Sequence, residues 1–286
     1  MIDKDIFEGI GLGEPQVADK IGAEAKIEIK DNLPDRNVIK IRLYTKDAMR
    51  LLKSEKTTYG KGKTNFVPGL DWFDTKVNDL VNSARNDDPF ADQMLKDLES
   101  NVVLLRENIE TESLKVREEL KNLFAYNEAT LVLNAHSHCA EVEVFFNHKL
   151  TSAVFWLVKE VDKMLYFVYQ AEKHNLISSS VAKTYRNDAK RTVRNTLRTV
   201  NNWKHTAITR KDIALGTKRV AKAFELNSKV TLTREVLLLE ERADCAPYIS
   251  TRSHDQLEPD VKKALLKLVE GDAEKMHEAE ALKQTS

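Results

Sequence analysis

A long stripe of apolar residues at helical spacing constrains the fold of this chain more than any other feature. The stripe consists of Leu95, Leu98, Val102, Leu105, Ile109, Val116 and Leu123. Spacings of three, four and seven mark one face of an α-helix, and Pro89 suits its first turn. The same stripe is compatible with a two-stranded dimer contact, but Glu112 interrupts it. We therefore favour a long helix packed on the core of its own chain.

The remaining pattern predicts an α+β fold that is mostly α-helical. Thr45 is a plausible N-cap for a helix to about Lys53, and Ser178 to Ser180 can cap a helix to about Lys204. Further helices are expected at residues 71–85, through Trp156 to about His174, and at 212–226, 233–242 and 259–271. Short strands are expected at residues 25–30, 38–44, 129–134 and 141–146, the last two forming a β-hairpin, with a Gly/Lys loop at 56–68.

Composition excludes several classes of protein. With nine Gly, six Pro and two Cys among 286 residues, the chain is not a collagen, a disordered tail or a disulfide scaffold. The start is acidic and shows no signal peptide. The most apolar stretch, residues 153–169, contains four charged residues, so it is expected to be a buried helix rather than a membrane span. These features favour a cytoplasmic protein with no membrane partner.

A net charge of zero conceals a strong segregation of charge. Residues 36–63 hold nine basic and two acidic residues, and residues 180–219 hold eleven basic and two acidic residues. Residues 71–120 hold thirteen acidic and six basic residues. Because a polyanion responds to the local field rather than to the total charge, the two basic segments are candidates for binding one.

The strand Val38 to Tyr44 alternates sharply. Its apolar side consists of Ile39, Ile41 and Leu43, and its other side of Lys40, Arg42 and Tyr44. A two-stranded ribbon fits the major groove of DNA, so base reading by this strand requires a homodimer with paired strands. The alternative is an edge strand whose cations prevent aggregation.

The helix expected after Ser178 is also asymmetric. Lys183, Lys190, Arg194 and Arg198 lie opposite an apolar stripe, with Arg186 and Arg191 on the flanks and Asp188 as the only acid. We interpret this face as a phosphate contact; salt bridges to the acidic helices of residues 71–120 are the main competing interpretation.

Candidates for catalysis are weak. His136, His138, Cys139 and His148 supply enough donors for a tetrahedral zinc site, but their spacing matches no common zinc motif. Gly62-Lys63-Thr64 resembles the end of a phosphate-binding loop but lacks the required upstream glycine. We therefore expect no enzyme activity, no metal and no cofactor; a metal-dependent nucleic-acid enzyme is the remote alternative.

Several blocks, in the expected order over residues 38–250, resemble the AcaB-like regulators of conjugative plasmids and their relatives in integrating conjugative elements. The blocks are residues 43–51 (LYTKDAMRL), 67–70 (VPGL), 86–92 (NDDPFAD), 142–146 (VEVFF), 171–178 (AEKHNLIS) and 208–212 (ITRKD). The resemblance implies a dimeric, DNA-binding transcriptional activator of transfer genes with a ribbon-helix-helix-like element. Placed on this sequence, the ribbon is Val38 to Tyr44 and the next helix begins at Thr45.

These arguments together predict a homodimeric, sequence-specific regulator of conjugative-transfer genes that binds double-stranded DNA, with a possible co-activator or anti-activator protein. Lys40, Arg42 and Tyr44 are expected to read bases. Phosphates are expected to contact Thr45, Lys46, Lys61, Lys63, Arg186, Lys190, Arg194 and Arg198. The alternative is a structural or assembly factor of the conjugation apparatus that docks on an acidic protein partner.

Four parts are expected along the chain. They are a weakly structured segment (1–35), a ribbon-helix-helix-like DNA-binding element with long helices (36–126), a helical domain with the β-hairpin and the basic helix (127–272), and a polar tail (273–286).

Overall fold

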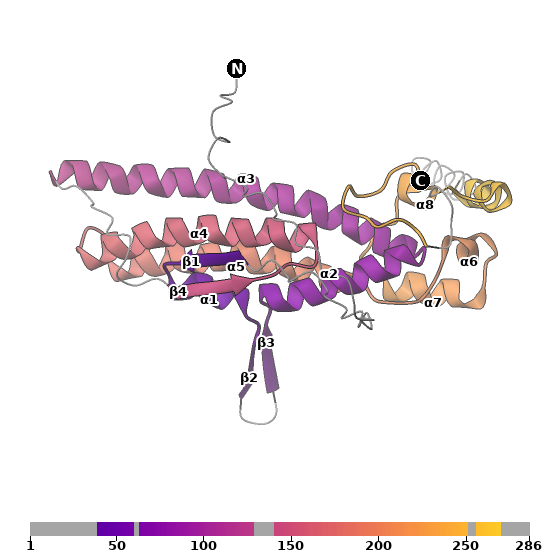
Figure 1. Cartoon of the computed structure of the whole chain (residues 1–286), viewed down its shortest axis with the longest axis horizontal. Helices are drawn as coiled ribbons and strands as arrows, with labels where there is room; N and C mark the ends of the chain where they lie inside the picture. The colour runs from indigo at the N-terminus through magenta and orange to yellow at the C-terminus, as the bar shows by residue number, and fades with distance from the viewer. Residues whose placement is uncertain (1–38, 60–62, 129–139, 251–255, 270–286) are drawn as a thin grey trace, which may run out of the picture. The chain divides into compact units, whose positions relative to one another are not determined.

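The computed structural model describes residues 39–59, 63–128, 140–250 and 256–269, which belong to one compact unit. The elements are β1 (Ile39–Leu43), α1 (Lys46–Leu52), β2 (Glu55–Tyr59), β3 (Lys63–Val67), α2 (Leu70–Arg85), α3 (Pro89–Tyr126), β4 (Ala140–Val144), α4 (Lys149–Lys173), α5 (Ser179–Thr199), the 3-10 turn η1 (Val200–Asn202), α6 (Arg210–Ala214), α7 (Lys218–Leu226) and α8 (Arg234–Leu237). Residues 259–269 are also helical. The expected α+β, mostly α-helical fold is confirmed (Figure 1).

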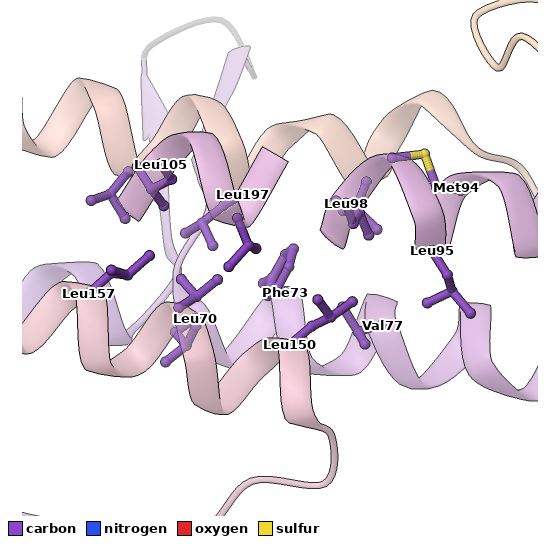
Figure 2. Close-up of a cluster of buried hydrophobic side chains, with 14 of the residues drawn as sticks. Leu70, Phe73, Val77, Met94, Leu95, Leu98, Leu105, Leu150, Leu157 and Leu197 are labelled. Atoms are coloured by element: carbon purple, nitrogen blue, oxygen red, sulfur yellow. The ribbon is translucent and has the colours of Figure 1, made fainter. Parts of the chain in front are cut away.

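The core lies between the long helices α2, α3, α4 and α5. The apolar stripe of α3 is buried inside the chain from Leu95 to Val116, and α3 packs against α2, α4 and α5. Figure 2 shows side chains of these helices, such as Phe73, Leu98 and Leu150, pointing toward one another. The interpretation of α3 as a core helix is therefore confirmed, because its stripe is not available for a dimer seam.

Local signals fix the starts of these helices. The Asp88 carboxylate accepts hydrogen bonds from the backbone N–H groups of Phe90 and Ala91, and Pro89 occupies the first turn of α3. Ser178 caps α5 through the backbone N–H of Val181. Such caps satisfy donors that have no partner within the helix, which is why these starts were predictable.

The strand at residues 140–144 pairs differently from the expectation. Strand β4 is antiparallel to β1, with Arg42 opposite Glu141 and Lys40 opposite Glu143. The prediction of a local hairpin with residues 129–134 is not tested, because those residues lie outside the described ones, as does the strand expected at 25–30. Strand β1 therefore pairs with a strand of its own chain that follows nearly a hundred residues later in the sequence.

The segment expected to be a Gly/Lys loop is instead a β-hairpin. Strands β2 and β3 pair in antiparallel register from Glu55 with Val67 to Tyr59 with Lys63. At the base of the hairpin the chain ends approach closely, because a Cβ placed on Gly69 would lie 2.2 Å from the carbonyl carbon of Lys53. The hairpin projects away from the helices on the side of α1, opposite to α3 (Figure 1).

The C-terminal helices are shorter than expected. The helix predicted at 212–226 is two helices, α6 and α7, because Gly216 adopts a positive φ of 61° between them. Helix α8 spans only part of residues 233–242. One hydrophobic core includes residues from both sides of the boundary expected between residues 126 and 127, for example Leu105 of α3 and Val158 of α4.

None of the helices in the described ranges combines the length and the apolar character that a membrane crossing requires.

Candidate nucleic-acid interface

The cations of β1 are matched by carboxylates of β4. Lys40 Nζ lies 3.1 Å from Glu143 Oε1, and Arg42 Nε lies 3.1 Å from Glu141 Oε1. Exposed pairs of this kind contribute little to stability, but their carboxylates repel a phosphate backbone as strongly as the cations attract it. The outward side of the β1–β4 sheet is therefore close to neutral, which weakens the prediction that Lys40 and Arg42 read bases.

Tyr44 and Thr45 are held by α4 rather than presented to a partner. The Tyr44 ring lies 4.4 Å from the Lys159 ammonium and 5.3 Å from the Tyr166 ring. The Thr45 hydroxyl donates to Asp162, a fully buried residue of α4, and accepts from the backbone N–H of Ala48. Thr45 is thus the predicted N-cap of α1, and its exposure of only 4% weighs against the phosphate contact expected there, which stays a prediction.

Arg186 and Lys190 of α5 are also engaged within the chain. Arg186 Nη1 lies 2.7 Å from Glu172 Oε2, and its guanidinium lies over the Tyr169 ring. Lys190 Nζ lies 2.7 Å from Asp47 Oδ1, while the Tyr169 hydroxyl donates to Asp47 Oδ2. Burial opposes ionisation of Asp47, but the hydrogen bonds from Lys190 and Tyr169 outweigh it and lower the pKa of Asp47. The Lys190 pair fastens α5 to α1 and the Arg186 contacts fasten α5 to α4, so both cations are engaged within the chain.

A different set of cations belongs to α1, the start of β2 and α5, and α1 and α5 pack against each other. Lys46 and Arg50 are exposed and lie one turn apart on α1, and Lys53 is the exposed, extended residue that ends this helix. We call basic face the set Lys46, Arg50, Lys53, Lys56, Arg194 and Arg198. Within the described part of the chain, none of the six has an ion pair within 4.0 Å. Of the predicted phosphate contacts, this face includes Lys46, Arg194 and Arg198.

Arg194 lies close enough to Arg50 and Arg198 of the basic face to feel their charges. Burial lowers the pKa of its guanidinium, Glu55 and Asp47 act in the opposite direction, and the neighbouring charges of Arg198 and Arg50 lower it further. These charges are therefore close enough to act on one another. The Nε atom of Arg194 is buried and has no hydrogen-bond partner. A buried donor without a partner is costly, and the charges near Arg194 include the carboxylates of Glu55 and Asp47 as well as the cations Arg198 and Arg50.

The acidic groups near the basic face are few. Asp47 already binds Lys190 and Tyr169. Glu55 is exposed and is flanked in the chain by Lys53 and Lys56. The local field of this face is therefore positive, in contrast to the outward side of β1. Lys61 lies outside the described residues, and Lys63 is the first residue of β3.

A second cluster of charges is buried, and it was not predicted from the sequence. Arg210, which is fully buried, contacts Asp87 and Asp92 at 2.8 Å each. Arg242 also binds Asp92 at 2.8 Å. Asp87, Asp92 and Arg210 come from two blocks that carry the family resemblance, residues 86–92 and 208–212, and their contacts join the start of α3 to α6. We assign this cluster a structural role, because the side chains of Arg210, Asp87 and Asp92 are buried and not open to a ligand.

The described residues give no support to a metal site. His148 caps α4 through the backbone N–H of Leu150 and contacts the carbonyl of Cys245 at 3.2 Å; burial lowers its pKa. His136, His138 and Cys139 lie outside the described residues. Among the residues that are described, no group of three possible metal ligands occurs.

Comparison with known proteins identifies one family. The family model of the transcriptional regulator AcaB matches residues 34–250, which include the basic face and the Arg210 cluster. No curated protein matches the chain. Among solved structures, the crystal structure of selenomethionine-containing AcaB from uropathogenic E. coli is similar, with a TM-score of 0.45 and 11% identity over 73% of this chain and 100% of that chain.

Proposed function

Because the chain belongs to the AcaB family of transcriptional regulators, we propose that it binds double-stranded DNA through its basic face. In this proposal the protein activates conjugative-transfer genes and acts as a homodimer, as the family resemblance implies. The observation that supports DNA binding best is that the cations of the basic face, among them Arg50, Arg194 and Arg198, have no ion pair among the described residues.

The basic face suits the phosphate backbone rather than the bases. Arginine binds phosphate through a planar fork of donors, and Arg50, Arg194 and Arg198 come from two helices that pack against each other. The Lys190–Asp47 pair fixes α5 to α1, so the cations keep their spacing when the duplex arrives. Contacts of this kind fix the position of the protein on DNA without reading the sequence.

A homodimer would place two basic faces on one duplex. Twofold symmetry in the protein then calls for a palindromic operator whose half-sites are about one helical turn, or a multiple of it, apart.

Salt dependence separates this proposal from docking on an acidic protein. We expect the purified protein to bind a fluorescent duplex in an anisotropy titration. If four of the six cations contact phosphates, the slope of log K against log salt is about −3.6 for each protomer. Poly-glutamate of matched charge is the competitor. Absence of duplex binding at 50 mM salt, or stronger binding to poly-glutamate than to DNA, would contradict the proposal.

A further inference from the structure

The β2–β3 hairpin begins at the basic face and has no place in the core. Strand β2 follows directly after Lys53 and contains Lys56. The side chains of Glu55, Lys56, Thr58 and Asn65 are exposed. No described side chain of the two strands belongs to the hydrophobic core. Because the described side chains of the hairpin lie outside the core, they are not needed to complete the helical packing, and the exposed polar ones are available for another role.

The base of the hairpin is nevertheless well anchored. The Asp71 carboxylate of α2 accepts hydrogen bonds from the backbone N–H and the hydroxyl of Ser54, at 2.8 and 3.2 Å. Phe66 packs edge-on against Trp72, with 5.5 Å between ring centroids. An isolated two-stranded hairpin is only marginally stable in water, and these contacts compensate for that. They also fix the direction in which the hairpin leaves the basic face.

The Phe66 contact distinguishes the two sides of the hairpin. Neighbouring residues of a strand point to opposite sides, so Asn65 lies on the side opposite to Phe66. Since Phe66 turns toward α2, Asn65 turns away from the helices. Lys56 pairs with Phe66 in the register and so lies on the side that faces α2.

We propose that the β2–β3 hairpin enters the major groove and that Asn65 reads a base there, while the basic face holds the flanking phosphates. This inference rests on the proposed DNA-binding function and goes beyond it by naming the element that reads sequence. The reading ribbon is then formed within one chain, whereas the sequence-based expectation used β1 strands from two protomers. On β1 the cations face the carboxylates of Glu141 and Glu143.

The dimensions and the chemistry agree with this assignment. The major groove is about 12 Å wide and admits a two-stranded ribbon, whose strands lie about 4.8 Å apart. Each strand has five residues, so the paired strands are about 15 Å long and can lie along the groove with the Asn65 side toward the bases. An asparagine amide matches the paired acceptor and donor that adenine presents in this groove.

Selection from a randomised duplex pool, followed by sequencing of the bound fraction, tests this inference. The variants are Asn65→Ala in the hairpin and Arg198→Ala in the basic face as the matched control. Both side chains are exposed, so neither variant is expected to impair folding, and thermal unfolding of each checks this. We expect the wild type to select a motif that contains adenine at a defined position.

Asn65→Ala should lose the preference at that one position by about 5- to 150-fold and keep the rest of the motif. Arg198→Ala should bind all sequences more weakly and select the same motif. If Asn65→Ala keeps every base preference of the wild type, or the wild type binds duplexes without preference, the hairpin assignment is wrong while DNA binding stands. If the wild type binds no duplex, the proposed function itself fails.

Discussion

Removing the buried Arg210 guanidinium should destabilise the protein more than any change on the basic face. Its guanidinium makes ion pairs of 2.8 Å with Asp87 and Asp92, and it donates to the carbonyl oxygens of Leu237 and Val236 at 3.1 and 2.8 Å. The variant Arg210→Met keeps most of the side-chain volume but leaves these acceptors without their donor.

The magnitude follows from burial. Removing one partner of a buried ion pair typically costs about 3–5 kcal/mol, because a buried charge stays uncompensated. Arg242 still binds Asp92 in the variant, so we expect about 3 kcal/mol rather than the upper end of that range. For a typical domain this is a large part of the total free energy of unfolding, which is about 5–15 kcal/mol.

Urea unfolding followed by circular dichroism measures this change. The matched control is Arg219→Met, because Arg219 also pairs with an aspartate, Asp212, at 3.2 Å, but its side chain is 64% exposed. An exposed pair contributes about 0–1 kcal/mol. If Arg210→Met lowers the free energy of unfolding by no more than Arg219→Met does, the assigned role of the Arg210 cluster is refuted.

Two further changes test the packing around this core. Burial raises the pKa of Asp88 to about 6. The folded state therefore binds this proton more tightly than the unfolded state does. As a result, the free energy of unfolding falls by about 3 kcal/mol as the pH rises from about 4 to 6. Asp88→Asn keeps an N-cap side chain and should lack this loss relative to the wild type in urea unfolding between pH 4 and 7; parallel pH profiles would contradict the argument. Gly69→Ala should lower the free energy of unfolding by at least about 2 kcal/mol, because its Cβ would lie 2.2 Å from the Lys53 backbone; a variant as stable as the wild type would show that the approach is not tight.

Helices were predictable here because their signals are local. The apolar stripe of α3, Pro89 at its start and the caps Thr45 and Ser178 each depend on residues within a few positions. The family was also recognisable, because its blocks follow one another in the expected order, and the family match over residues 34–250 confirms this.

Strand partners were harder to predict because they depend on distant residues. Alternation showed which residues of β1 share a side but not that β4 pairs with it. One signal was present: the alternating cations Lys40 and Arg42 complement the alternating carboxylates Glu141 and Glu143. The β2–β3 hairpin was not predicted because its strands are polar and lack the alternation of apolar and polar residues that marks a strand. The glycines and lysines of this segment suggested a loop instead.

The candidate site was predictable only in part for the same reason. Charge counts found the two basic segments, but tertiary pairing decides which cations stay unpaired. Lys190 pairs with Asp47, more than 140 residues away, and Arg186 pairs with Glu172. The local sequences around Arg194 and Arg198 differ very little from those around Arg186 and Lys190, so the sequence alone does not show which of these cations are paired.

The salt dependence of DNA binding by two matched double variants tests the central claim most directly. Arg50→Gln with Arg198→Gln removes two cations of the basic face, and Lys40→Gln with Arg42→Gln removes two cations of β1. The basic-face variant should reduce the magnitude of the slope of log K against log salt by about 1.8 for each protomer, at about 0.9 for each lost phosphate contact. The β1 variant should leave the slope unchanged. A reduced slope in the β1 variant together with an unchanged slope in the basic-face variant would contradict the account.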